Sequence, residues 1–189
     1  MGFKPAETGG GPPEEADSRI LAWATGREVR EAAPLLQLEE ALAPAVAAAR
    51  AGRTFDRAEA LARIERLRKD EGTLVVEGAG GLLVPLSFTC TALDLAREAG
   101  LDAVVVGRAG LGTLNHTLLT VRALETAGVR LRGVVLNGSR LRDLAEETNP
   151  EVLARLLPGV TVIVCPHQGE GDARMIASRL APLLGALLT

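Results

Sequence analysis

The stretch "AVVVGRAGLGTLNHTLLTVRALETAGVRLRGVVLN", Ala103 to Asn137, contains the signals of a strand, a helix and a second strand in that order. "AVVVG" and "RGVVLN" are apolar runs without alternation, which is typical of strands that are covered on both faces. Between them, "LNHTLLTVRALETAG" carries apolar residues at three-and-four spacing and closes on Gly128, and helix ends favour glycine. This succession predicts a parallel sheet with right-handed crossover connections.

The same arrangement occurs on both sides of this stretch. "TLVVE" (Thr73 to Glu77) and "VTVIVC" (Val160 to Cys165) read as further strands. "TALDLAREAG" and "NPEVLARLLPG" read as helices that close on Gly100 and Gly159. The sequence therefore predicts an α/β fold in which helices cover both faces of a parallel sheet.

The first third of the chain has a different pattern. "PPEEADSRILAWATG" predicts a helix that begins at proline, and "LEEALAPAVAAARAG" an alanine-rich helical stretch broken at Pro44. "DRAEALARIERLRKDEG" predicts an amphipathic helix opened by Asp56. We expect these stretches to form a helical layer on the same domain. A length of 189 residues suits one domain better than two, so we predict a single domain over residues 1–189.

Composition excludes several classes of protein. Apolar residues make up 47% and charged residues 24%, as in ordinary globular chains. Three Phe, one Trp and no Tyr argue against stacking on nucleic-acid bases, and a net charge of -3 argues against a phosphate-tracking surface. The two cysteines form no CxxC pair, so neither a disulfide framework nor a zinc site is expected. No membrane span or signal peptide is apparent, and the cytoplasm is the expected location.

Ligands of parallel α/β sheets bind beyond the carboxyl ends of the strands, where "VVEGAGG" (Val75 to Gly81) lies. Glu77 ends the apolar run, so its carboxylate is expected to be partly desolvated and to need a metal ion, a lysine or a helix N-terminus as partner. The glycines after it allow backbone N–H groups to approach an anion closely. The alternative is a tight turn with a solvated acid.

A second candidate is "GFKPAETGGG", which begins at Gly2. Pro5 favours an extended backbone at Lys4, and a strand-end lysine followed by Thr8 suits anion binding. The alternative is a solvated surface lysine. Asp17, in the helix that follows, is either a site residue or a first-turn acid that complements the helix dipole.

Two further loops are candidates in the second half of the chain. In "GLGTLNH" (Gly110 to His116), glycines lead into a helix whose first N–H groups can bind a phosphate or a carboxylate. His116 is either an acid or base or a packing residue. In "LNGS", Asn137 is placed to read a base edge with its amide, or is a plain turn residue.

The chain resembles the dethiobiotin synthetase family in a series of motifs that occur in the family's order. They are "KPAETG", an aspartate near the start of the next helix, "VVEGAGGLLVPL", "GLGTLNH" and "VLNGS". Members of the family are ATP-dependent ligases that close the ureido ring during biotin synthesis. "VEGAGG" alone is also similar to the cobyrinic acid amidase group, whereas "VEGAGG" followed by "VPL", together with "GTLNH", is more specific. The resemblance runs from Lys4 almost to the C-terminus and implies a P-loop NTPase-like fold.

The resemblance implies roles for individual residues. Lys4 would be catalytic and would stabilise the carbamate and the transferring phosphoryl group. Asp17 and Glu77 would hold Mg²⁺ and contact the nucleotide. The implied substrate-binding residues are Thr8, Gly80, Gly81, Gly112, Thr113 and Asn115.

The resemblance also implies a homodimer and a nucleotide pocket. Gly112, Thr113 and Asn115 would bind the carboxylate tail of the diamine in the other subunit. Asn137 would read adenine, with Pro166 and His167 nearby. In the family reaction, 7,8-diaminononanoate forms a carbamate with CO₂, ATP phosphorylates it, and the second amine closes the ring.

The sequence departs from the family pattern at its start. The family opens with a strand, a GxxxxGK[ST] phosphate loop and a helix, whereas residues 1–189 contain no such segment and begin at what would be the second strand. Two hypotheses follow: an ATP-dependent dethiobiotin synthase, truncated or late-started, or a non-catalytic dimeric module that retains the substrate pocket. A cobyrinic acid amidase-like enzyme is a third, which would need a further domain with a nucleophilic cysteine.

Overall fold

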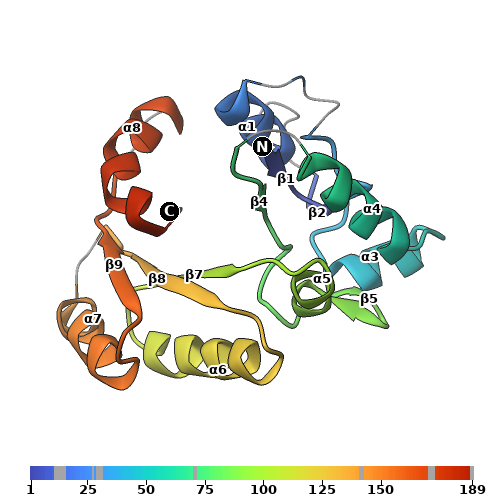
Figure 1. The fold of residues 1–189 in the computed structure, drawn as a ribbon. Coiled ribbons are helices and arrows are strands. Elements are labelled where there is room, and N and C mark those ends of the chain that lie inside the picture. The colour runs from blue at the N-terminus through green and yellow to red at the C-terminus, as the bar shows by residue number, and fades with distance from the viewer. Residues whose placement is uncertain are drawn as a thin grey trace. The chain divides into compact units, whose positions relative to one another are not determined.

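The computed structural model describes residues 1–10, 16–26, 28, 32–69, 72–140, 143–169 and 173–187. The chain divides into two compact units, Met1–Ala99 (unit 1) and Gly100–Thr189 (unit 2), and Figure 1 shows the elements of each. Each unit has apolar clusters of its own. The single domain expected over residues 1–189 stays a prediction.

Unit 2 contains a three-stranded parallel sheet in the order β7-β8-β9. Its strands are β7 (Ala103–Arg108), β8 (Leu131–Asn137) and β9 (Thr161–Cys165). All three were predicted from their apolar runs, with ends that differ by one residue at most. The long β-branched runs supply enough pairing residues to give an unbroken sheet.

Helices cover both faces of this sheet, as predicted (Figure 1). Helices α6 (Thr113–Thr126) and α7 (Leu144–Leu156) pack on one face, over a cluster that includes Val121, Val134 and Leu153. On the other face, α8 (Ala173–Leu184) and the 3₁₀ turn η2 (Gly185–Leu187) cover Val135 and Cys165.

One helix boundary in unit 2 was predicted wrongly. The pattern predicted a helix over 149–159, but α7 begins at Leu144 and contains Pro150 in its interior. The Asp143 side chain accepts a hydrogen bond from Glu146 N at 2.7 Å and so begins the helix earlier. Because Pro150 lacks an N–H, the helix passes through it with one backbone hydrogen bond missing.

Unit 1 is built from very short strands. β1 (Gly2–Phe3) pairs in parallel with β4 (Val75–Val76), and β2 (Ala6–Thr8) pairs in parallel with β3 (Leu36–Leu38). β5 (Pro85–Ser87) and β6 (Cys90–Thr91) form an antiparallel hairpin. β4 lies within the strand predicted over Thr73 to Glu77, and β1 ends directly before Lys4, which was expected at a strand end. The helical layer expected in the first third did not include β2 and β3, because strands of three residues give no periodic signal.

The described residues of unit 1 include the helices α1 (Asp17–Thr25), α3 (Pro44–Arg50), α4 (Arg57–Leu67) and α5 (Ala92–Glu98). Asp56 opens α4 as predicted, since its side chain accepts from Glu59 N at 2.9 Å. The predicted helical stretch over 38–52 is wrong at its start. Leu38 ends β3, and Pro44 begins α3 because a first-turn proline needs no N–H partner. The predicted proline start of α1 lies outside the described residues.

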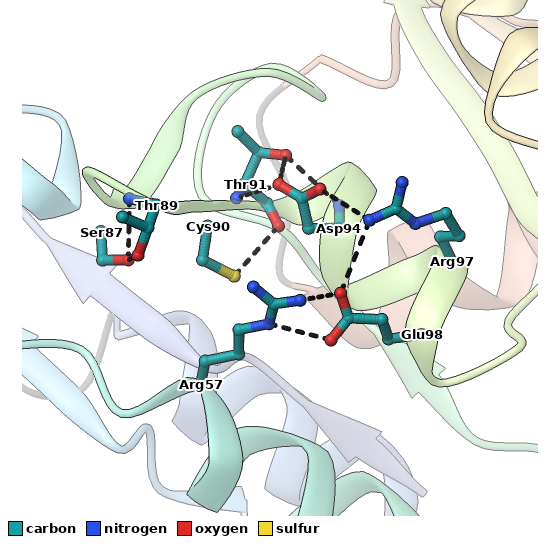
Figure 2. A network of polar contacts seen from close by, with 8 residues as sticks. All are labelled: Arg57, Ser87, Thr89, Cys90, Thr91, Asp94, Arg97 and Glu98. Carbon is teal, nitrogen blue, oxygen red and sulfur yellow. Dashed lines mark hydrogen bonds and ion pairs between the residues drawn. The ribbon is translucent and has the colours of Figure 1, made fainter.

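Figure 2 shows a polar network that joins α4, the β5–β6 hairpin and α5. Arg57 Nε donates to Glu98 Oε2 at 2.9 Å, and the two side chains form an ion pair. Thr91 N donates to Asp94 Oδ2 at 2.9 Å while Asp94 N donates to Thr91 Oγ1 at 3.3 Å, which completes a capping box. The hydrogen bonds from Thr91 hold the pKa of Asp94 below its usual value. The start of α5 is thus fixed directly after the hairpin.

Among the helices that the structure describes, none combines the length and the apolar character that crossing a membrane requires.

Candidate active site

Strand pairing in unit 1 brings Lys4 beside Glu77. The parallel register of β1 and β4 aligns Phe3 with Val76, and Glu77 N continues the ladder by donating to Phe3 O at 2.9 Å. The next residue of each strand therefore lies opposite the other, and Lys4 Nζ donates to Glu77 Oε1 at 2.9 Å. The predicted need of Glu77 for a positive partner is met by a lysine in the structure.

Asp17, the first residue of α1, is the second acid on the same ammonium group. Lys4 Nζ donates to Asp17 Oδ2 at 2.5 Å. The Lys4 side chain is 9% exposed, whereas those of Asp17 and Glu77 are 46% and 48% exposed. The structure thus brings these three predicted residues together, with the cation buried and both carboxylates open to solvent.

The charge state of Lys4 follows from its surroundings. Burial is the largest single influence and lowers the pKa of Lys4, because a low dielectric disfavours an ammonium. The hydrogen bonds to Asp17 and Glu77, together with the negative charges of both acids, outweigh burial and raise the pKa of Lys4 above its usual value. Lys4 is therefore a cation at neutral pH.

Lys4 also lines a cleft of about 340 Å³ within unit 1. Thr8 and Gly80, two of the predicted substrate-binding residues, line the same cleft. The remaining lining residues are Leu42, Ala43, Pro44, Ala79 and Val84. One part of the cleft is thus polar and cationic, and the rest of its wall is apolar.

Gly80 cannot readily be replaced at this position. Its φ of +77° lies in the left-handed region, and an added Cβ would approach Val84 Cγ2 at 3.1 Å. The backbone therefore forms this part of the cleft wall. Gly81 follows it in the chain but is not among the residues that line the cleft.

Glu7 is a site residue that the sequence interpretation missed. It lies on β2 and is buried. Its Oε1 accepts from Asp17 N at 2.6 Å, and its Oε2 accepts from Ser18 Oγ at 3.1 Å. The signal that could have identified Glu7 is an acid between Ala6 and Thr8 in a short segment of small residues.

In unit 2, the structure gathers the predicted nucleotide residues at the carboxyl edge of the sheet. Asn137 ends β8 and pairs in register with Cys165, the last residue of β9. Gly138 N donates to Cys165 O at 2.9 Å, which keeps the two strand ends together. Asn137, Pro166 and His167 are all exposed at this edge. Their contact with a nucleotide stays a prediction.

The predicted carboxylate-binding loop leads into α6. Gly112 precedes the helix with φ +92°, a conformation that few other residues adopt. Thr113 is buried and its Oγ1 lies 3.4 Å from Thr117 Oγ1, whereas Asn115 is exposed. The Asn115 side chain is therefore open to a ligand, and the Thr113 hydroxyl faces the interior of unit 2.

Two buried polar residues of α7, also missed, hold the loops of unit 2. Asn149 Nδ2 donates to Ala109 O at 2.8 Å and to Gly110 O at 3.1 Å. The Glu146 carboxylate accepts from Ser139 N at 3.0 and 3.1 Å. The loops that follow β7 and β8 are thus fixed by side chains of one helix.

Comparison with known proteins identifies the class. A family described as AAA domain matches residues 2–167, in agreement with the mixed α/β fold and its parallel strands. The chain is 41% identical over 188 residues to ATP-dependent dethiobiotin synthetase BioD of Anaeromyxobacter sp. (strain K), covering 98% of this chain and 83% of that relative. It is 40% identical over 174 residues to the protein of the same name from Aquifex aeolicus (strain VF5), covering 88% and 79%. The chain belongs to the ATP-dependent dethiobiotin synthetase family.

Proposed function

We propose that this chain is an ATP-dependent dethiobiotin synthase, which closes the ureido ring of 7,8-diaminononanoate with CO₂. The observation that carries the proposal is the buried cation Lys4, held by two acids, in a cleft whose remaining wall is apolar. A carbamate and a phosphoryl group are anions and need a fixed cation, whereas the hydrocarbon chain of the diamine needs an apolar surface.

Lys4 supplies positive charge and hydrogen bonds, and does not act as a base. Its raised pKa keeps it protonated, and an ammonium has three N–H donors. Two of them serve Asp17 and Glu77, which leaves one for the carbamate or the transferring phosphoryl group. Because both acids fix the ammonium in advance, it needs little reorganisation as charge develops on the substrate.

The donor set of Asp17 and Glu77 fits Mg²⁺. Magnesium prefers oxygen ligands and is commonly bound by one or two carboxylates together with phosphates and waters. Both carboxylates are half-exposed and contact the same nitrogen, so they are close enough to share one cation. No cluster of three or more metal-binding side chains occurs in the described parts of the chain, so Asp17 and Glu77 would hold Mg²⁺ together with phosphate and water oxygens. When bound, Mg²⁺ neutralises negative charge on the phosphates of ATP.

The diamine is assigned to the cleft and the adenine to unit 2. Thr8 and the Gly80 backbone supply polar groups beside Lys4, where the amines react. The exposed Asn137 amide, with Pro166 and His167 on the neighbouring strand end, reads adenine.

A homodimer is part of this proposal, because the loop of Gly112, Thr113 and Asn115 binds the carboxylate tail of the diamine in the partner subunit. Gly112 and Asn115 are exposed, and the start of a helix favours an anion. We expect analytical ultracentrifugation at micromolar concentration to give twice the mass of 19.7 kDa. A monomer under these conditions would contradict the assignment of this loop to a partner's site.

The test uses two polypeptides: residues 1–189, and the same residues preceded by a family-type strand, GxxxxGK[ST] loop and helix (the extended chain). The loop adds two or more charge-assisted contacts to phosphate, each worth roughly 1.5 to 3 kcal/mol. We therefore expect ATP to bind the extended chain at least about a hundredfold more tightly in titration calorimetry.

The same test separates the two functional hypotheses. With ATP, Mg²⁺, bicarbonate and the diamine, the extended chain should form dethiobiotin, detected by mass spectrometry. Diamine binding without dethiobiotin formation would favour the non-catalytic module. Equal ATP affinity of the two polypeptides would show that residues other than the phosphate loop hold the phosphates.

A further inference from the structure

The N-terminus of α1 is capped from a distance. Ala16, which precedes the helix, has no side-chain acceptor and makes no capping hydrogen bond. The first N–H of the helix instead meets the buried carboxylate of Glu7 on β2, with Asp17 N at 2.6 Å from Glu7 Oε1. A local capping residue would satisfy this N–H wherever the helix lay, whereas Glu7 fixes the helix start relative to β2.

Glu7 holds two consecutive residues of α1. Its second oxygen accepts from Ser18 Oγ at 3.1 Å, and Ser18 is itself buried. Two contacts from one carboxylate fix the direction of the first helical turn as well as its position. Burial of a carboxylate is costly unless such bonds satisfy it, and the positive end of the helix dipole favours its charge.

The segment from Lys4 to Glu7 therefore holds Asp17 at two points. Lys4 binds the Asp17 carboxylate at 2.5 Å, and Glu7 binds the Asp17 backbone N–H at 2.6 Å. Only Pro5 and Ala6 separate the two residues in the chain, so the distance between the two points is short and well fixed. A side chain whose backbone is anchored in this way has little freedom to leave its partner.

We propose that Glu7 is a positioning residue, which anchors the backbone of Asp17 so that its carboxylate stays on Lys4, the cation that lines the cleft. The inference rests on the proposed function, because it takes its importance from the roles assigned to Asp17 and Lys4. The hydrogen bonds of Lys4 go to Asp17 and Glu77, and Glu7 does not line the cleft.

The experiment compares four variants of the extended chain. Outer residues that orient a ligand typically contribute about 10- to 100-fold, so Glu7→Ala should lower kcat for dethiobiotin at least about tenfold. Glu7→Gln keeps an amide oxygen for Asp17 N and should stay within about threefold of the parent. Ser18→Ala, the matched control, removes the second contact only and should also stay within about threefold. Asp17→Asn is the benchmark and should lose at least as much as Glu7→Ala.

A second readout does not depend on turnover. The Asp17 backbone amide, observed by ¹H–¹⁵N NMR in residues 1–189, should be shifted downfield and protected from hydrogen exchange by its short bond to a carboxylate. Glu7→Ala should remove both signatures, and Glu7→Gln should retain the protection. Glu7→Asp keeps the negative charge, but its side chain is too short to reach Asp17 N. It should therefore lose both signatures, and it provides the test if Glu7→Ala fails to fold.

Parent-like kcat in Glu7→Ala or Glu7→Asp, alongside an impaired Asp17→Asn, would overturn the inference and leave the proposed function intact. Parent-like kcat in both Asp17→Asn and Glu7→Ala would overturn the role of Asp17 in the proposed function, and the inference with it. An equal loss in Glu7→Ala and Ser18→Ala, matched by an equal loss of thermal stability, would show that Glu7 only stabilises the fold.

Discussion

Units 1 and 2 hold their candidate residues in place by different means. In unit 1 the strands have two or three residues, and charged side chains make the contacts that matter: Lys4 with Asp17 and Glu77, and Glu7 with the start of α1. In unit 2 the strands have five to seven residues, and polar side chains of α7 bind the backbone groups of the loops beyond β7 and β8. Stabilising the charges of a reaction needs fixed charged groups, whereas binding an uncharged ring depends mainly on the shape of its pocket.

This difference predicts how each unit responds to substitution. A charged network loses its function when one member is removed, because the remaining charges have no compensation. A loop whose carbonyl and N–H groups are bound by Asn149, Glu146 and neighbouring strands retains its path when an exposed side chain changes. Unit 1 should therefore be sensitive to loss of the charge of Lys4, Asp17 or Glu77, whereas Glu7 needs only the oxygen that accepts from Asp17 N.

The largest effect is expected for Lys4→Met in the extended chain. The substitution removes the cation and leaves Asp17 and Glu77 facing each other, so kcat for dethiobiotin should fall by about 10²- to 10³-fold, as when a preorganised donor is removed from other active sites. Lys69 is the only other lysine in the sequence and is exposed in the same unit. Lys69→Met is the control and should leave kcat within about twofold. Equal effects of the two substitutions would contradict the role of Lys4.

A smaller and more selective effect is expected for Glu77→Gln. One of the two carboxylates that we propose as magnesium ligands is lost, and a charge-assisted contact of about 1.5 to 3 kcal/mol corresponds to about 10- to 100-fold in Mg²⁺-ATP turnover. Diamine affinity, measured by calorimetry without ATP, should stay nearly unchanged because we assign this carboxylate to Mg²⁺ and it does not line the cleft. Parallel loss of turnover and diamine affinity would rule out the assignment of Glu77 to magnesium.

The same contrast explains what the sequence could and could not predict. The strands of unit 2 were predictable because runs such as "AVVVG" and "VTVIVC" are long enough to show their character. In unit 1, β2 and β3 were missed because three residues carry no period, and Leu38 was assigned to a helix on the strength of the alanines that follow it. These short strands form because each has a partner strand to pair with, and the local sequence pattern does not indicate them.

The candidate site was predictable residue by residue but not as a geometry. Lys4, Asp17 and Glu77 were predicted from their positions and from family motifs. The contact of Lys4 with Glu77 follows from the register of β1 with β4, and its contact with Asp17 from the position of the start of α1. Glu7 and Asn149 were not found, because each acts through the backbone of a residue distant in sequence. Contacts of this kind produce no local pattern of residue spacing from which they could be predicted.

The smallest expected effect tests whether the unit with the longer strands, unit 2, also protects its buried side chains better from solvent. Cys90 lies in a two-residue strand of unit 1 and Cys165 at the end of β9 in unit 2, and both thiols are buried. Burial is the main cause that raises the pKa of each thiol above its usual value. Because the thiolate is the nucleophile, both should react more slowly with iodoacetamide at pH 8 than free cysteine, and faster as pH rises.

Their relative rates depend on the apolar cluster above each thiol. Cys90 belongs to a cluster with many buried members, including Leu36, Leu86 and Leu95. Among the residues that the structure describes, Cys165 shares its cluster with two other buried residues, Val135 and Leu187, against which partly buried residues pack. Local opening is easier where fewer apolar contacts must be broken. We therefore expect Cys165 to be alkylated several-fold faster than Cys90 in residues 1–189, as measured by peptide mass spectrometry.

Leu187→Ala provides the matched variant for this comparison. It removes one of the few buried residues beside Cys165 and lies in unit 2, so it should speed alkylation of Cys165 further and leave Cys90 unchanged. In urea both thiols should react at the same rate, since neither retains its cover. If Cys90 proves the faster thiol under native conditions, strand length rather than cluster size governs local opening, and the short strands of unit 1 are its weakest part.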